Sequence, residues 1–175
     1  MIKENLENAI REKISLSDCN RAPYAPEPIL NGIPTLGKGV YKKLSPMLKD
    51  RFEKYGRWEQ ATHGSWLSIT DMETLWEDKI DDEFLSRIKS AIQVAASGEG
   101  WTDHACALFK DNRISAFAAS DNGYESIILL WLDSEEEPEF WVYDSNGESR
   151  YKNLDVYLTA YINDDLSASE NSWRA

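Results

Sequence analysis

Residues 114–162 read ISAFAASDNGYESIILLWLDSEEEPEFWVYDSNGESRYKNLDVYLTAYI, and this stretch decides the fold class of the chain. Residues 114–119 alternate with the period of two that is typical of a strand. The Asp-Asn-Gly sequence at 121–123 then predicts a tight turn. Residues 124–132 become apolar on both faces toward their end, which indicates a central strand covered on both sides.

The second half of this stretch predicts a loop, a strand and a helix. Residues 133–139, DSEEEPE, are too rich in charge for a strand and predict a solvated loop. The sequence EFWVYD at 139–144 is the next expected strand, and Asn146-Gly147 predicts the turn that follows it. Asn153 is a suitable cap for a final helix. The apolar residues of that helix recur at helical spacing: Leu154, Tyr157, Leu158, Tyr161 and Ile162.

The first part of the chain is expected to be helical and then irregular. Apolar residues recur at helical spacing in residues 2–14, which predicts an amphipathic helix. Residues 19–39 contain four prolines and three glycines. Because proline is unsuited to both helix and central strand, this segment predicts an ordered loop or linker. A boundary between an N-terminal arm and the main body is expected there.

Two helices with a connecting strand are expected next. Ser45-Pro46 predicts the start of a helix, and Gly56 predicts the left-handed residue that ends it. The sequence WLSI at 66–69 alternates weakly and predicts a short strand. Thr70 and Glu73 have the spacing of a capping box, which predicts a short helix through Trp76.

A longer helix and a further strand complete the pattern. The apolar stripe that follows Asp81 and Asp82 predicts a helix that ends at Gly98. The sequence HACALF at 104–109 predicts a strand. Helices followed by antiparallel strands and a closing helix predict an α+β fold. We expect a mixed, mainly antiparallel sheet of about four to six strands, with helices packed on one side.

Three parts of the chain are predicted from these elements. Residues 1–35 form an N-terminal helix and proline-rich arm, and residues 36–165 form the α+β domain. Residues 166–175 are polar and are expected to form a flexible tail.

The composition describes an acidic chain that is able to form a core. Of its 175 residues 42% are hydrophobic and 11% are aromatic, which excludes global disorder. The net charge of -12 divides into +4 for residues 1–57 and -16 for residues 58–175. An acidic body repels nucleic acid and attracts basic proteins. Solubility alone is the alternative explanation of this charge.

No segment predicts export or insertion into a membrane. The N-terminal sequence MIKENLENAIREKI lacks the apolar run of a signal peptide. The longest apolar run, at 127–132, is too short to span a bilayer. Cys19 and Cys106 are therefore expected to be free thiols. We expect a soluble, cytoplasmic protein that is a monomer or a weak homodimer.

One group of residues has the composition of a catalytic site. His104 and Cys106 would share one face of the predicted strand with Asp103 beside them, as in a thiol nucleophile. Side chains adjacent on one strand rarely reach the required geometry, and no oxyanion-hole motif accompanies them. We therefore favour a half-buried strand pair and expect no enzyme activity. A cysteine hydrolase would instead lose its turnover in Cys106→Ala.

Metal and phosphate sites are not predicted. The acidic clusters at 71–73, 81–83 and 135–137 do not follow EF-hand spacing, and the GKG sequence at 37–39 is far from a phosphate loop. We expect no metal and no cofactor. The basic residues are interpreted as a solvated face, because the charge of the whole chain opposes nucleic-acid binding. They are Lys38, Lys42, Lys43, Lys49, Arg51, Lys54 and Arg57.

The run AFAASDNGYESIILLWLDSEEEPEFWVYDSNG, with the YKNLDVYLTAYI helix after it, resembles the C-terminal half of the SUKH superfamily. Upstream, KKLSPMLKDRFEKYGRW resembles a helix of that family and WLSITDMETLWED a following segment. The resemblance covers about residues 36–165. The chain departs from the pattern at Ser45-Pro46, where Leu-Pro is usual, and in its long helical region at 80–100.

The resemblance implies an α+β fold and a binding function. Many bacterial members of the superfamily are immunity proteins that bind and neutralise a polymorphic toxin, and a fungal relative regulates cell-wall synthesis. The family supplies no catalytic residues. The alternative is an intracellular protein-interaction or regulatory module of the same fold with a non-toxin partner.

The resemblance and the acidic charge together predict an immunity protein that binds a cognate, basic, nuclease-like toxin in a stoichiometric complex. Charged residues would steer the encounter, and aromatic residues would anchor the complex. Core packing is favoured over partner contact for Trp131. The expected contact residues are Asp133, Glu135, Glu136, Glu137, Glu139, Trp141 and Tyr143.

Overall fold

The computed structural model describes residues 8, 11–12, 22–97, 107–133, 135–145 and 147–164. Two antiparallel sheets and four helices are formed by these residues. The small sheet pairs β1 (Ile33–Pro34) with β2 (Tyr41–Lys42). The large sheet has six strands in the order β3-β4-β5-β6-β7-β8. They are β3 (Trp58–Thr62), β4 (Gly64–Trp66), β5 (Ile114–Ala119), β6 (Ser126–Leu130), β7 (Glu139–Asp144) and β8 (Gly147–Tyr151).

The α+β class is confirmed, and all pairings between the described strands are antiparallel rather than mixed. The helices are α2 (Pro46–Lys54), α3 (Ile69–Thr74), α4 (Glu83–Ala96) and α6 (Leu154–Asn163). Of the predicted first helix, Asn8, Arg11 and Glu12 are described and are helical. The other residues of that segment and the tail from 165 lie outside the described residues.

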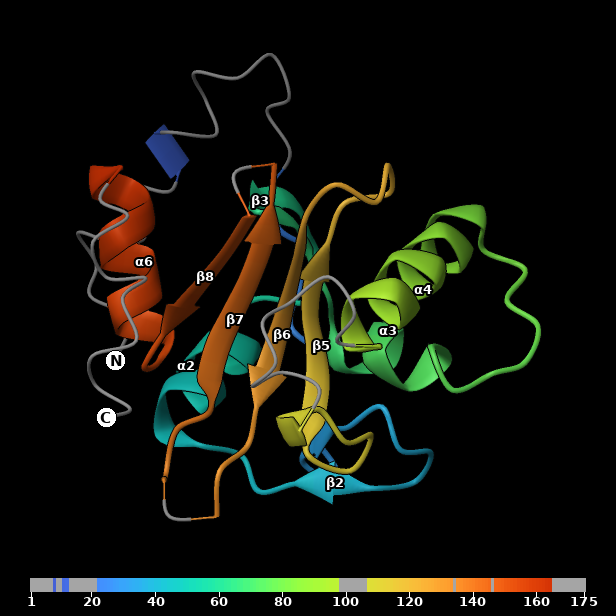
Figure 1. Ribbon diagram of the computed structural model, residues 1–175. Helices are drawn as coiled ribbons and strands as arrows, with labels where there is room; N and C mark the ends of the chain where they lie inside the picture. Colours follow the sequence, from blue (N-terminus) through green and yellow to red (C-terminus); the bar gives the residue numbers. More distant parts are fainter. Residues whose placement is uncertain are drawn as a thin grey trace.

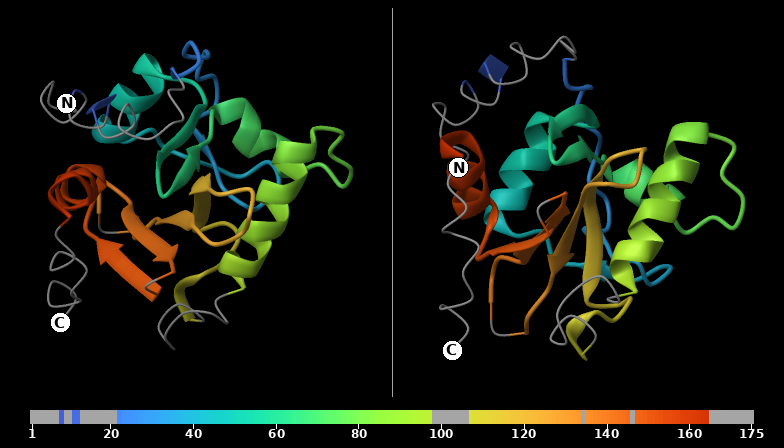
Figure 2. Two further views of the ribbon diagram at one scale, coloured as in Figure 1. Left: turned by 90° about the horizontal axis from the view of Figure 1, so that it is seen from above. Right: turned by 45° about the horizontal axis from the view of Figure 1, so that its top comes forward.

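The helices pack on both faces of the large sheet, so the prediction of one covered face is wrong. Phe140 stacks on Tyr157 of α6, whereas the neighbouring Trp141 points to the opposite face and packs on Phe109. Figure 1 shows α4 to the right of β5 and α2 behind the sheet, and the view from above in Figure 2 places these two helices on different sides of the sheet. The physical reason is that every residue of β5 and β6 is buried, so both faces need a cover.

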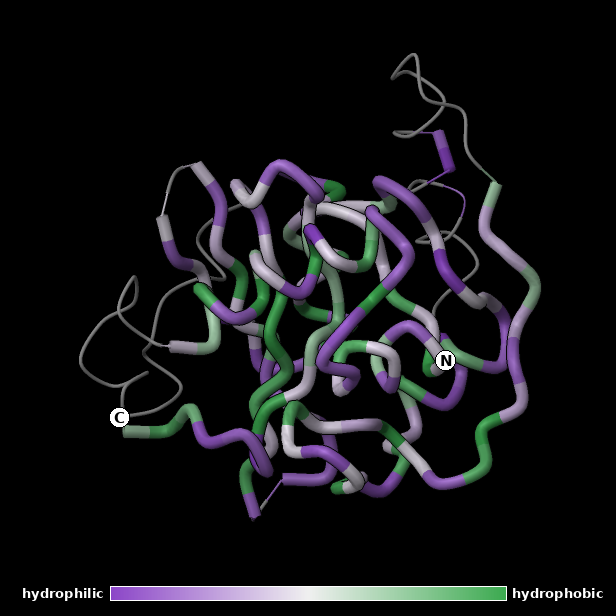
Figure 3. The backbone as a smooth tube through the Cα atoms, turned by 90° about the vertical axis from the view of Figure 1, so that its right-hand side faces the viewer, coloured by the Kyte–Doolittle hydropathy of each residue, from purple (hydrophilic) through white to green (hydrophobic). Residues whose placement is uncertain are grey.

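The core lies on the two sides of the central strands. Figure 3 shows hydrophobic segments running through the interior of the molecule and hydrophilic segments at many of its turns. Trp58, Trp66, Phe117 and Phe140 form one chain of ring contacts on the α2 and α6 side of the sheet. Ile33 is fully buried in the same core. The backbone N–H of Tyr24 donates to Arg57 O at 2.8 Å, so the proline-rich segment also contacts the body.

Several predicted elements are confirmed by their residues. The strands β5 and β7 have the predicted bounds, and Gly123 adopts a φ of 79° in the turn after β5. Asp82 caps α4 by accepting the N–H of Leu85 at 3.0 Å. Asn153 caps α6 by accepting the N–H of Val156 at 3.0 Å. Gly98, at the predicted end of α4, lies outside the described residues.

The region from 56 to 76 differs from its prediction. A strand, β3, precedes the predicted one, and β4 ends at Trp66 instead of running through 69. The strand stops there because Ser68 caps α3 and forms a capping box with Asp71, two residues before the predicted box.

Two further predictions of local structure are wrong. Gly56 follows Tyr55 without a left-handed φ; glycine is required because a Cβ there would lie 2.3 Å from Ala25 O. Of the predicted strand at 104–109, residues 107–109 are described: Ala107 and Leu108 are helical, and Phe109 lies in neither a helix nor a strand.

Candidate functional site

An open groove of about 670 Å³ lies beside the predicted contact loop. One wall is the segment 42–49, which joins β2 to α2, and the other is the segment 131–136, which follows β6. Figure 1 shows these two segments side by side at the lower end of the large sheet. We call this feature the charged groove. Its lining residues are Lys42, Lys43, Leu44, Ser45, Pro46, Lys49, Trp131, Leu132, Asp133, Glu135 and Glu136.

The acidic wall of the charged groove is fixed at its first end by Trp131. The Nε1–H of this tryptophan donates to Ser115 Oγ at 3.0 Å, and its backbone N–H donates to Arg113 O at 2.9 Å. Trp131 is 7% exposed, so most of its ring belongs to the core, as predicted. Asp133 extends from this anchor and pairs with Arg113 at 3.1 Å.

The acidic wall is fixed at its second end by Glu137. Its Oε1 accepts the backbone N–H of Met47 at 2.8 Å, and its Oε2 accepts the Ser45 hydroxyl at 2.6 Å. Glu137 therefore caps α2, while the side chain of the predicted cap, Ser45, makes no capping hydrogen bond to the helix. A carboxylate at a helix N-terminus is favoured by the helix dipole. The contact ties the two walls of the groove together.

We expect Glu137→Ala to lower the free energy of unfolding by about 1–2 kcal/mol, because α2 loses its cap and a favourable charge. Chemical denaturation of the purified chain measures this change. Glu136→Ala is the matched control: its side chain is exposed, and a change within about 0.5 kcal/mol is expected. Equal losses in the two variants would contradict the capping role of Glu137.

The structure divides the predicted contact residues into two groups. Asp133, Glu135 and Glu136 line the charged groove, whereas Glu137 is bound to the start of α2 and is not part of the lining. Glu139 and Trp141 lie in β7 and are 2% and 0% exposed.

The predicted solvated loop therefore ends before Glu139, and Glu139 and Trp141 are buried rather than exposed for contact with a partner. The side chain of Glu139 is accommodated in the sheet because its Oε2 accepts the Trp141 Nε1–H at 2.8 Å. Tyr143 is partly buried near the far end of β7 and does not line the groove.

The basic wall is the part of the site that the sequence interpretation missed. Lys42, Lys43 and Lys49 were expected to form a solvated face; Lys43 and Lys49 are exposed, and all three lysines also line the charged groove. The signal was present as a cluster of lysines before α2, but its partner wall is about ninety residues away in the chain. Two other members of the cluster are structural: Arg51 is fully buried, and Arg57 forms a bidentate pair with Asp71.

A second polar cluster surrounds His63 in the turn between β3 and β4. His63 Nε2 lies 3.3 Å from Asp144 Oδ2, and His63 Nδ1 lies 2.8 Å from the Tyr157 hydroxyl. Tyr157 is fully buried, and burial raises the pKa of its phenol well above its ordinary value. The hydrogen-bonded series Asp144, His63 and Tyr157 therefore ends at a protonated phenol that is buried in the core and inaccessible to a substrate. This cluster fastens the turn to β7 and α6.

Glu125 lies close to this cluster and carries a shifted pKa. Burial raises the pKa of its carboxyl, and the charge of Asp144 raises it further. Because the folded-state pKa is above the unfolded value of about 4.5, the folded state binds the proton more tightly. Stability therefore falls as pH rises from the unfolded pKa through the folded one.

We expect Glu125→Gln to unfold at a higher temperature than the wild type at pH 7.5, because the variant keeps an acceptor oxygen but no charge. The difference should shrink as pH falls below about 4.5, where the wild-type carboxyl is protonated in both states. Thermal unfolding at several pH values measures it. A wild type that remains the more stable protein at pH 7.5 would contradict the destabilising charge.

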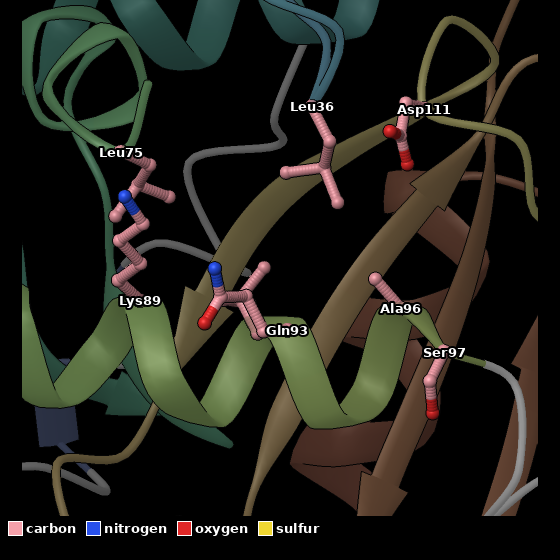
Figure 4. Close-up of a pocket in the computed structure, with 8 residues that line it drawn as sticks. Leu36, Leu75, Lys89, Gln93, Ala96, Ser97 and Asp111 are labelled. Carbon is pink, nitrogen blue, oxygen red and sulfur yellow. The ribbon is translucent and has the colours of Figure 1, made fainter. Parts of the chain in front are cut away.

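A further cavity of about 290 Å³ lies beside α4. Figure 4 shows Lys89, Gln93, Ala96 and Ser97 of α4 along one side, with Leu36 and Asp111 across from them. Lys89 Nζ donates to Glu77 O at 2.5 Å and is engaged in holding α4 to the preceding loop. The lining places Lys89 and Asp111 at opposite ends, so it offers no paired groups for acid-base chemistry.

The residues considered for catalysis, Asp103, His104 and Cys106, lie outside the described residues. In the described parts of the chain, no three His, Cys, Asp or Glu side chains gather in a group that could hold a metal ion. Among those same parts, no helix is long and apolar enough to cross a membrane. Comparisons with known protein families, with curated proteins and with solved structures gave no match to this chain.

Proposed function

We propose that this protein acts without catalysis, as an immunity protein that neutralises a cognate, nuclease-like toxin by direct stoichiometric binding. The proposal combines the resemblance of residues 36–165 to the SUKH superfamily with the charged groove. In this proposal the protein works in the cytoplasm, where a nuclease toxin would reach its nucleic-acid substrate.

The observation that carries the proposal is the way the acidic wall is held. Trp131 is buried and bonded to Ser115 before the loop, and Glu137 is bound to the start of α2 after it, so both ends of the loop are fixed. Glu135 and Glu136 between them are exposed. A loop that is fixed at its ends and exposed at its centre loses little conformational entropy when a partner binds. Exposed carboxylates also increase the rate of encounter with a basic protein.

The experiment is a calorimetric titration of the purified chain with the toxin domain encoded by a neighbouring gene, at low and at high salt. A stoichiometric complex that inhibits the toxin is the expected result. We expect Glu135→Lys/Glu136→Lys to weaken the complex strongly. Glu77→Lys/Asp78→Lys is the matched control, because it changes the net charge equally at two exposed residues outside the groove.

Three outcomes separate the parts of the proposal. Absence of binding at either salt concentration contradicts the immunity function. Equal weakening by the two double variants contradicts the role of the groove and leaves the effect to net charge. A complex with a housekeeping protein, with no toxin gene nearby, supports a regulatory module instead.

A further inference from the structure

The charged groove carries charges of both signs on opposite walls. Lys42, Lys43 and Lys49 line it from the segment before and within α2. Asp133, Glu135 and Glu136 line it from the loop after β6. Three cations and three anions leave the groove electrically neutral, although the whole chain has a net charge of -12. The groove therefore differs from the acidic patch that the loop sequence predicts by itself.

These charges do not neutralise one another by direct contact. Within the parts of the chain that the structure describes, no ion pair of 4.0 Å or less joins the two walls. The ion pairs that two of the wall residues do form lead elsewhere, from Lys49 to Glu53 at 3.8 Å and from Asp133 to Arg113 at 3.1 Å. A segment that enters the groove thus meets a basic surface on one side and an acidic surface on the other.

This arrangement selects between two kinds of partner surface. Opposite charges at contact distance attract each other, and like charges repel each other by a similar amount. A uniformly basic segment gains such attraction from the acidic wall and suffers a similar repulsion from the lysine wall. A segment with acidic side chains on one side and basic side chains on the other is attracted by both walls. Charge complementarity therefore favours the second kind.

Apolar groups between the walls provide a place for an anchor. Leu44 and Leu132 are partly exposed in the groove, and Pro46 is exposed at the start of α2. The edge of Trp131 lies beside them. Partly exposed apolar groups rimmed by charges are the usual composition of a protein-binding site.

We propose that the occupant of the charged groove is an extended protein segment with basic side chains along one side and acidic side chains along the other. Successive side chains of an extended segment point in opposite directions, so alternating Lys and Glu residues produce this pattern. The inference rests on the proposed function in one respect, that the groove binds protein. It differs from the proposed function in the charge of the partner: the segment that enters the groove carries both signs of charge instead of basic side chains alone.

The test uses three synthetic peptides of equal length on the isotopically labelled full chain, with chemical shifts read by NMR. The first alternates Lys and Glu, the second has the same composition as a block of Lys followed by a block of Glu, and the third contains Lys alone. We expect the alternating peptide to shift residues of both walls and to bind about threefold to tenfold more tightly than the other two.

Charge reversal of one wall should change this preference. Lys42→Glu/Lys43→Glu leaves Lys49 against five carboxylates in the lining, so the groove becomes predominantly acidic. We expect this variant to prefer the all-lysine peptide. Glu135→Lys/Glu136→Lys makes the groove predominantly basic. We expect this variant to lose affinity for the alternating and all-lysine peptides but not for the block peptide, whose glutamate block is attracted to a basic groove. Unchanged thermal unfolding of the variants confirms that they are folded.

Three results would overturn the proposal. The first is a wild-type chain that binds the all-lysine or block peptide as tightly as the alternating one, and the second is shifts confined to residues outside the groove. The third is a dimer that Lys42→Glu/Lys43→Glu dissociates, because the occupant is then a second copy of the chain. Each of these results is independent of the toxin titration, so the immunity function and the mixed-charge contact fail separately.

Discussion

Gly64→Ala is expected to lower the free energy of unfolding by more than about 4 kcal/mol or to prevent folding. Gly64 begins β4 at the point where β4 meets the end of β5. A Cβ at this position would lie 2.3 Å from Ala119 C and 2.5 Å from Ser120 N, which are backbone atoms held in the sheet. The residue also has a φ of +81°, a conformation that alanine adopts at a cost of about 1–2 kcal/mol.

The matched control for this substitution is Gly123→Ala. Gly123 has a φ of +79°, nearly the same backbone conformation, but a Cβ there has no neighbour within 4 Å. The control should therefore show the conformational penalty alone, about 1–2 kcal/mol. Chemical denaturation measures both variants, and the yield of soluble protein serves where Gly64→Ala does not fold. Equal losses would mean that the strands separate easily enough to admit a methyl group.

Arg51→Ala is the second substitution with a large expected effect. Arg51 is fully buried, and its guanidinium donates to Tyr55 O at 2.7 Å, to Leu67 O at 2.9 Å and to Gly56 O at 3.1 Å. Burial lowers the pKa of Arg51 to about 9, against the opposing effect of the charge of Asp71. At neutral pH the side chain is therefore a buried cation that binds three carbonyls.

We expect Arg51→Ala to cost about 3–5 kcal/mol, because three buried carbonyls lose their donor and a cavity forms among the aromatic rings. The guanidinium carbon of Arg51 lies 4.1 Å from the centre of the Phe52 ring, so packing is lost together with charge. Arg87→Ala is the control, since its side chain is 54% exposed and pairs with Glu83 at the surface. A loss below about 1 kcal/mol is expected for it.

An alternative result for Arg51 is informative. Because burial lowers the pKa of Arg51, the unfolded state holds the proton more tightly, so burial of the charge opposes folding and does so most strongly below about pH 9. If Arg51→Ala loses no more stability than Arg87→Ala, then the free energy gained by removing the buried charge offsets the loss of the three hydrogen bonds. The residue would then have no net stabilising role.

The central strands and the two long helices were predictable because their signals are local. The turn residues at 121–123 mark where β5 ends. The alternation and length of EFWVYD predicted β7. The caps of α4 and α6 are supplied by Asp82 and Asn153, each three residues before the N–H that it accepts. Such contacts depend on neighbours in the chain, so the sequence specifies them without knowledge of the fold.

The strand β3 was not predictable for a physical reason. Gln60 adopts a φ of 51°, and the register of β3 against β4 shifts between Trp58 and Thr62. A bulge of this kind breaks the alternation of inward and outward residues on which strand prediction depends. The covering of both sheet faces was also missed, although residues 127–130 of β6, which are apolar on both faces, had indicated a doubly covered strand.

In the candidate site, too, features set by neighbouring residues were predictable from the sequence, whereas contacts between distant segments were not. The α+β class, the central strands and an acidic loop after residue 132 were predictable, since each follows from residues close together in the chain. The tertiary structure alone decided that Glu139 and Trp141 are buried, that Glu137 caps a helix about ninety residues away, and that lysines face the acidic loop. These contacts join distant segments, and charge and burial at such contacts depend on packing rather than on local pattern.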